Sequence, residues 1–151
     1  MNGGDWLWAV GGLAAVGVLT GGIGAALGML QDKTKLHPSF MAFEPIGPGR
    51  YWILGAWLPF FVLNIVGEEF VWRGVVMPRQ EVAFGGRAWL VNGILRLLFH
   101  SAFRWQVLLA LVPITLILPY VVQRRRSNWA GIVIHGGFGA VGFLALAFGL
   151  A

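Results

Sequence analysis

Five long apolar runs, separated by short polar connections, dominate the pattern of hydrophobic and polar positions along the chain. The runs cover residues 6–30, 51–77, 89–103, 106–122 and 129–150. A helix rises about 1.5 Å per residue, so about 20 apolar residues suffice to cross the hydrocarbon core of a membrane. The pattern therefore predicts an all-α membrane protein, built as a polytopic bundle of about five transmembrane helices.

The composition supports the membrane-protein class and indicates which kinds of partner the chain has. Hydrophobic residues make up 58% of the chain and charged residues 11%, whereas about 25% is usual in soluble domains. There is no cysteine, which excludes disulfides and thiolate metal sites. The net charge of +5 comes from basic residues at the ends of apolar runs or singly within them, which favours contact with anionic lipid over nucleic acid. We divide the chain into an N-terminal transmembrane helix with a polar connection, residues 1–50, and a core, residues 51–151.

Three charged residues interrupt the second apolar run, and each costs roughly 2.5–3.5 kcal/mol near the centre of a bilayer. Glu69 and Arg73 are four residues apart on one helical face and can neutralise each other. Glu68 points about 100° away and has no charged partner in its own helix. Asn64, one turn earlier, can donate a hydrogen bond to Glu68 or to a carbonyl of another helix. An unpaired intramembrane carboxylate indicates a functional site.

Two histidines from other runs are expected to reach a depth similar to that of Glu68. The turns at 78–87 and 123–128 face one side of the membrane, because one joins the second and third runs and the other the fourth and fifth. Measured from that side, Glu68 lies about 15 Å deep, His100 about 17 Å and His135 about 10 Å. Arg96 shares a face with His100 and should contact Glu68, Glu69 or backbone carbonyls. We therefore expect a polar cavity inside the bundle.

A glutamate with two histidines suggests the activation of a water molecule. A desolvated carboxylate is suited to act as a general base near neutral pH, and histidine can hold the water or stabilise an oxyanion. Two histidines and a glutamate are also a known catalytic ligand set for zinc, although the chain has no His-Glu-x-x-His spacing. Metal-free hydrolysis and hydrolysis with zinc held by Glu68, His100 and His135 both remain open.

The order of these groups gives the chain a specific resemblance. A Glu-Glu-x-x-x-Arg group at 68–73 is followed by Phe99-His100 in the next run, and then by His135 after the turn Ser127-Asn128-Trp129. Over roughly residues 60–150 the chain resembles the CPBP family, the CAAX-protease and bacteriocin-processing intramembrane proteins also called the Abi family. The resemblance implies a helical bundle around a cavity open to the cytosol, and endoproteolysis of membrane-associated substrates such as prenylated proteins.

The resemblance also implies roles for individual residues. Glu68 would be the base that activates water, His100 would help to hold that water, and His135 would belong to the oxyanion hole. Glu69 and Arg73 would support the geometry of the site. The resemblance further favours the arginine-rich turns, and with them the N-terminus, on the cytosolic side. We expect an integral protein of a prokaryotic plasma membrane.

Two positions depart from the family's motifs. In the motif Phe-x-x-x-His the first position is Arg96, which places a charge where an aromatic ring packs. In the motif His-x-x-x-Asn the last position is Gly139, which removes a side-chain donor from the proposed oxyanion hole. Gly139 shares one helical face with Gly131 and His135, so it is alternatively a glycine for close helix packing.

Three functions are consistent with these observations. The leading hypothesis is an intramembrane endopeptidase of the CAAX-protease type, dependent on glutamate or on a metal. The second is a catalytically silent relative that binds a membrane partner or confers immunity, which the glycine at 139 favours. The third is a small proton- or ion-coupled carrier, because intramembrane carboxylates also mark transport paths. The sequence leaves the oligomeric state open.

Overall fold

The computed structural model describes residues 2–30 and 45–149, and these ranges are helical without a strand. This confirms the predicted all-α class. Residues 31–44 of the predicted polar connection lie outside the described ranges. The elements are, in chain order, α1 (Gly3–Leu30), the 3₁₀ turn η2 (Pro48–Arg50), α2 (Trp52–Glu69), the π-helix η3 (Phe70–Val76), α3 (Met77–Phe84), the 3₁₀ turn η4 (Gly85–Arg87), α4 (Ala88–Phe99), α5 (Trp105–Arg125) and α6 (Asn128–Ala147).

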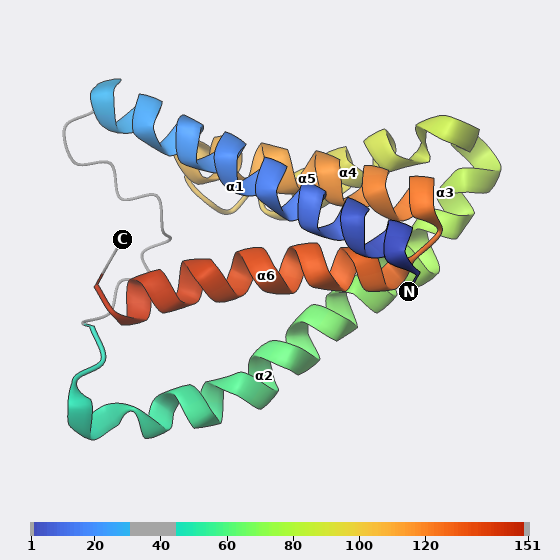
Figure 1. Ribbon diagram of the computed structural model, residues 1–151. Helices are drawn as coiled ribbons and strands as arrows, with labels where there is room; N and C mark the ends of the chain where they lie inside the picture. The colour runs from blue at the N-terminus through green and yellow to red at the C-terminus, as the bar shows by residue number, and fades with distance from the viewer. Residues whose placement is uncertain (1, 31–44, 150–151) are drawn as a thin grey trace.

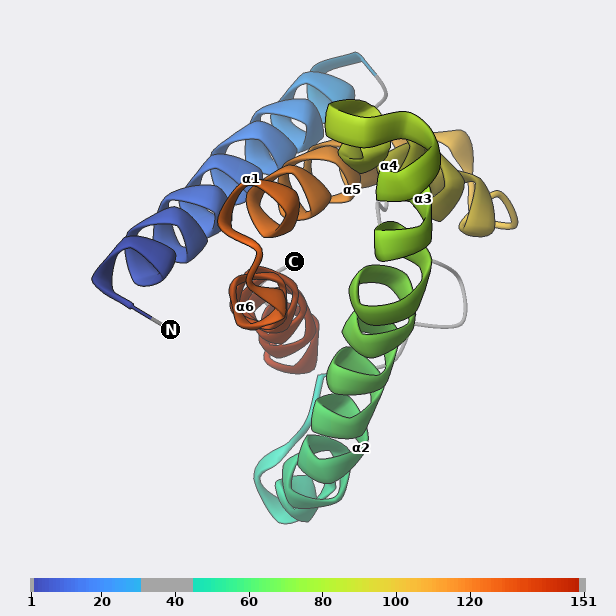
Figure 2. The same cartoon turned by 90° about the vertical axis from the view of Figure 1, so that its right-hand side faces the viewer.

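Helices α1, α5 and α6 pack against one another, and α4 packs along α5. The backbone of α2 lies nearest α6 at its C-terminal end and diverges from it toward its N-terminal end (Figures 1 and 2), where Trp57 of α2 stacks on Phe143 of α6 with ring centroids 3.9 Å apart. The N-terminus and the connection between α5 and α6 lie at one end of the bundle (Figure 1). There the Asp5 carboxylate accepts a hydrogen bond from Arg125 Nε at 3.0 Å. The predicted placement of the N-terminus on the side of the arginine-rich turn is therefore confirmed.

Four helical stretches of the described chain are long and apolar enough to cross a membrane: Gly3–Met29, Trp52–Phe99, Trp105–Arg125 and Asn128–Ala145. The second of these contains both the second and the third predicted spans, because the chain stays helical from α2 into α3 and reverses only at η4. Gly85, with φ of 53°, allows this reversal because a side chain would disfavour that backbone angle. The turn predicted at 78–87 is thus shorter than expected.

Helix α4 is also shorter than predicted. Its 12 residues extend about 18 Å, well short of a hydrocarbon core about 30 Å thick. It ends at Phe99, and His100 serves as its C-terminal cap rather than lying within a span. At the other end, Gln123 of α5 accepts a hydrogen bond from the Trp89 backbone N–H and donates one to the Gly85 carbonyl, each at 2.9 Å. Helix α4 therefore brings polar side chains only part of the way across the bundle.

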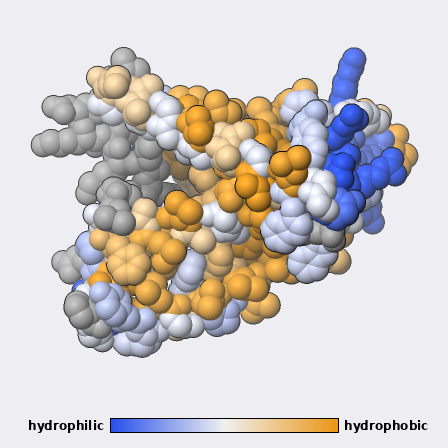
Figure 3. Space-filling view, viewed as in Figure 1, coloured by the Kyte–Doolittle hydropathy of each residue, from blue (hydrophilic) through white to orange (hydrophobic). Residues whose placement is uncertain are grey.

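Apolar side chains fill the centre of the bundle between α1, α5 and α6. Val16, Leu118 and Ile134 are each at most 1% exposed. The outer surface of these helices is also largely hydrophobic, whereas hydrophilic residues gather at the end that holds the N-terminus and the α5–α6 connection (Figure 3). This distribution is typical of a protein whose sides face lipid and whose end faces water.

Glycines in α1 do not all have the role that their spacing predicts. Gly17, Gly21 and Gly28 form part of a small-xxx-small pattern, yet a Cβ added at any of them would meet nothing within 4 Å. Within the described residues these three glycines are therefore not required for close contact with another helix. Close packing instead occurs at Gly12, where a Cβ would lie 2.8 Å from Ile134 Cδ1 of α6.

Candidate functional site

The charged residues of the second span lie where the helix changes its winding. Glu68 and Glu69 end α2, and Arg73 lies in the π-helix that follows. Such π-helical segments are rare and often lie at functional sites. Despite the wider turn, Arg73 Nη1 donates a hydrogen bond to Glu69 Oε1 at 3.2 Å, and both side chains are buried. The predicted Glu69–Arg73 pair is confirmed.

Glu69 has a second partner that the sequence did not predict. His135 on α6 donates from Nδ1 to the same oxygen, Oε1, at 2.8 Å, because an ionised carboxylate can only accept. The other oxygen, Oε2, is buried without a hydrogen-bond partner in the described residues. A Cβ added at Gly131 would lie 2.8 Å from this Oε2, so the glycine makes room for the carboxylate. Glu69 therefore orients His135 while remaining fully buried.

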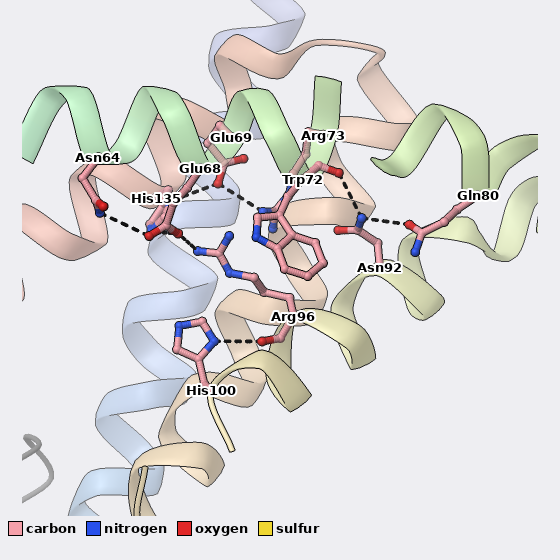
Figure 4. A network of polar contacts seen from close by, with 10 residues as sticks. All are labelled: Asn64, Glu68, Glu69, Trp72, Arg73, Gln80, Asn92, Arg96, His100 and His135. Carbon is pink, nitrogen blue, oxygen red and sulfur yellow. Dashed lines mark hydrogen bonds and ion pairs between the residues drawn. The ribbon is translucent and has the colours of Figure 1, made fainter. Parts of the chain in front are cut away.

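Glu68 lies at the meeting point of three elements, as Figure 4 shows. Its carboxylate accepts a hydrogen bond from Asn64 Nδ2 at 3.2 Å and forms an ion pair with the Arg96 guanidinium of α4. His135 Nε2 lies 4.0 Å from Glu68 Oε2. The predicted contacts of Asn64 and Arg96 are confirmed. The side chain of Glu68 is 33% exposed, whereas that of Glu69 is 0% exposed, so only Glu68 is accessible from outside.

Arg96 is held in place by residues that the sequence reasoning missed. Its Cζ lies 5.5 Å from the centre of the Trp72 ring, within range of a cation–π interaction. Asn92, one turn earlier on α4 and fully buried, donates from Nδ2 to the Trp72 carbonyl at 3.1 Å and to Gln80 Oε1 at 2.9 Å. These bonds tie α4 to the π-helix. The polar side chain of Asn92 within an apolar run, on the Arg96 face, was the signal that could have revealed it.

Both predicted histidines line one cavity, but only His135 lies near Glu68 in the described structure. His100 Nδ1 lies 2.8 Å from the Arg96 carbonyl, and no contact between His100 and Glu68 is found in the described structure (Figure 4). A cavity of about 240 Å³ is lined by both histidines, by both arginines, by Gly139 and by a wall from α5 and α6: Leu111, Ile114, Thr115, Leu118 and Phe138. Neither glutamate is among these lining residues, but each is paired with an arginine that is.

Zinc binding by Glu68, His100 and His135, which the sequence left open, does not fit the way these side chains lie. Arg96 occupies the Glu68 carboxylate and would compete with a dication for it. His100 directs Nδ1 at a backbone carbonyl and His135 directs Nδ1 at Glu69, which leaves Nε2 of each ring free within the described residues, so the obstacle to zinc is the ion pair and not the histidines. Within residues 2–30 and 45–149, no group of three or more His, Cys, Asp or Glu side chains is placed to hold a metal ion.

Comparison with known proteins gives one match. Residues 50–141, more than half of the chain, match the family model described as type II CAAX prenyl endopeptidase Rce1-like. This confirms the family that the sequence motifs predicted. Neither a curated protein nor a solved structure matches the chain.

Proposed function

Because the chain belongs to the Rce1-like type II CAAX prenyl endopeptidase family, we propose that it is an intramembrane endopeptidase. Its substrate would be a membrane-associated or prenylated peptide, and the reaction would add water across one peptide bond. In that reaction the water loses a proton, its oxygen bonds to the carbonyl carbon, and the leaving amine takes up a proton. The chain must therefore supply a base, donors for the negative oxygen, and a source of the proton for the amine.

The accessible carboxylate of Glu68 is the observation that carries this proposal. Of the two adjacent glutamates, Glu69 is fully buried, and its Oε1 accepts hydrogen bonds from both Arg73 and His135. Its carboxylate therefore cannot reach a substrate. Glu68 is one-third exposed and faces His135 Nε2 across 4.0 Å. We assign Glu68 as the base that takes the proton from water. A general base of this kind typically accelerates a reaction by about 100- to 10,000-fold.

The remaining side chains have supporting roles in the proposal. His135 keeps a proton on Nδ1, which it donates to Glu69, so its Nε2 can accept the proton that Glu68 takes from water. Once protonated, Nε2 can donate to the negative oxygen and pass the proton to the leaving amine. Arg73 holds Glu69 in place. His100 lines the cavity and can hold a water molecule there. Arg96 holds Glu68 through the ion pair and is a further donor near the developing negative charge.

The test is cleavage of a prenylated peptide by the purified chain in proteoliposomes. Glu68→Gln keeps the shape of the side chain but removes the base, so we expect cleavage to fall by at least about 100-fold. Asp5→Asn, the corresponding change on α1 at the end of the bundle, is the control and should leave the rate of the folded chain unchanged. If Glu68→Gln cleaves as fast as the unaltered chain while both remain folded, Glu68 is not the base.

A second candidate function is a catalytically silent relative that binds a membrane partner. The ion pair between Arg96 and Glu68 favours it, because a carboxylate oxygen that accepts from a guanidinium is less free to accept from water. Under this alternative the folded chain cleaves nothing even at high enzyme concentration. Binding of the prenylated peptide would then be equal for the unaltered chain and for Glu68→Gln.

A further inference from the structure

Two buried guanidinium groups on the cavity wall have nitrogen atoms without partners. Arg96 Nη1 and Arg73 Nε are each buried and have no hydrogen-bond partner within the described ranges. The two residues are 5% and 3% exposed, and both line the cavity of about 240 Å³. Each guanidinium already uses another nitrogen for a carboxylate: Arg96 Nη2 for Glu68 and Arg73 Nη1 for Glu69. A buried donor left unpaired is unfavourable, so a ligand that accepts from both would be held strongly.

The wall of the cavity offers hydrogen-bond donors to such a ligand, and no negatively charged side chain is among its lining residues. The donors on its wall belong to Arg73 and Arg96, and neither glutamate is among the lining residues. His100 and His135 also line the cavity, but each directs Nδ1 at an acceptor outside it, so Nε2 of each ring donates only when the ring is protonated. The hydroxyl of Thr115 is directed back to the carbonyls of Leu111 and Val112, each at 3.0 Å. The polar side of the cavity is therefore suited to an anion, because acceptor-only groups match unpaired guanidinium donors.

The opposite wall restricts what the anion can be attached to. This wall consists of Leu111, Ile114, Leu118 and Phe138, so it favours an anion that is attached to an apolar group. At about 30 Å³ for each water molecule in the liquid, the volume equals roughly eight waters. That is enough for a carboxylate and one apolar side chain, but small for a phosphorylated headgroup with its glycerol.

We propose that this cavity is a binding site for the carboxylate of an apolar molecule, with Arg96 Nη1 and Arg73 Nε as its donors. Two sources carry this chemistry: the C-terminal carboxylate of a membrane-associated peptide, and a free fatty acid. In the first case the site fixes the end of the substrate beside Glu68, and this reading rests on the proposed peptidase function. Because Arg96 holds Glu68 and the ligand with the same guanidinium, occupancy of the site is coupled to the position of Glu68.

Binding of four matched probes to the full chain in lipid nanodiscs tests the proposal. N-octanoyl-leucine carries the carboxylate, and N-octanoyl-leucinamide is identical except for an amide. Octanoate and octanol form the corresponding pair for a fatty acid. Calorimetry on the unaltered chain should give at least about tenfold tighter binding of an acid than of its neutral partner, as expected for one charge-assisted pair. The unaltered chain is used because Glu68→Gln alone would free Arg96 from its ion pair and so create an acid-binding cation by itself.

Substitution of Arg96 identifies the donor. Arg96→Met together with Glu68→Gln removes both members of the ion pair, so no unpaired charge is left buried. This double variant should bind acid and neutral partner equally. Arg79→Met in the otherwise unaltered chain is the control, because Arg79 is an exposed arginine bonded to the Val75 carbonyl, and it should retain the preference for the acid.

The results distinguish a peptide terminus from a fatty acid as the ligand, and they test the carboxylate site separately from the peptidase function. A preference for N-octanoyl-leucine alone supports a peptide terminus, and an equal preference for octanoate supports a fatty acid. Equal binding of acids and neutral partners, or a preference that survives Arg96→Met, overturns the carboxylate site. The measurement does not depend on cleavage, so a chain that binds acids through Arg96 but cleaves no peptide refutes the peptidase function and not this inference.

Discussion

At the scale of single residues, Glu68 and Glu69 show how environment divides one chemistry into two tasks. Glu69 is fully buried and receives Arg73 and His135 on one oxygen, so its position is fixed by two other elements. Glu68 is one-third exposed, and its partners Asn64 and Arg96 leave it within reach of a ligand. Burial with several partners suits a carboxylate that orients its neighbours, and partial exposure suits one that reacts.

Gly139 is the residue whose substitution best separates an enzyme from a silent relative. It lies one turn from His135 and lines the same cavity, so an asparagine there would present an amide donor beside the reacting oxygen. One donor of this kind is typically worth about 100- to 1000-fold in rate. Because the new side chain must also find room, we expect Gly139→Asn to raise peptide cleavage by about tenfold or more.

Packing at this position requires a matched control. A Cβ at Gly139 would lie 3.2 Å from Phe61 Cε2, so the ring must shift by a few tenths of an ångström. This contact supports the alternative that Gly139 serves close packing of α6 against α2. Gly139→Ala adds the same Cβ without the amide and should not raise cleavage. Equal rates for the asparagine and alanine variants would show that no donor is missing at this position.

At the scale of elements, the approach of α4 to α5 determines where Arg96 can reach. A Cβ at Gly93 would lie 2.4 Å from the Thr115 carbonyl oxygen and 3.0 Å from Leu116 Cδ2. A backbone atom cannot move aside as a side-chain end can, so any side chain at 93 must push the helices apart. Arg96 lies one turn from Gly93, and its ion pair with Glu68 depends on this distance between helices.

We therefore expect Gly93→Ala to destabilise the protein by about 1–3 kcal/mol, the usual range for overpacking. For a chain of this size that lowers the midpoint of thermal unfolding by about 2–4 °C per kcal/mol. The control is Gly55→Ala on α2, where an added Cβ would meet nothing within 4 Å. Unfolding in detergent, followed by circular dichroism, provides the midpoints. Similar midpoints for the two variants would mean that α4 and α5 can separate without loss.

The arrangement of the helices also explains which contacts of the site could be predicted from the sequence. Spacing within one helix gave the Glu69–Arg73 and Asn64–Glu68 contacts, and the cost of an unpaired cation gave the contact between Arg96 and Glu68. Pairing of His135 with Glu69 depends on the rotation of α6 about its own axis, which its largely apolar sequence does not define. The π-helix was not predicted because a single widened turn leaves no clear periodicity.

At the scale of the whole molecule, Arg73 separates two cavities. One is the intramembrane cavity beside His100 and His135. The other, of about 250 Å³, is lined by Arg73, Gly74 and Met77 and by residues of the α5–α6 end of the bundle, including Gln123, Arg126 and Asn128. Hydrophilic surface gathers at that same end (Figure 3). A hydrolase buried in a membrane needs a path for water, and we propose that this second cavity brings water to Arg73.

Cysteine labelling can test this path directly, because the natural chain has no cysteine that would react in the background. Gly74→Cys places a thiol on the wall of the second cavity, and the added Cβ would lie 3.4 Å from Asn128 Nδ2, an ordinary contact. Val71→Cys is the matched control, because it belongs to the same π-helix but is half exposed on the outer surface. A charged methanethiosulfonate reagent requires water and the thiolate form, so Gly74→Cys in proteoliposomes should react at least about tenfold faster than Val71→Cys. Equal rates at the two positions would show that water does not reach Arg73 from this end, and the base at Glu68 would then have to receive its water from the exposed side of α2.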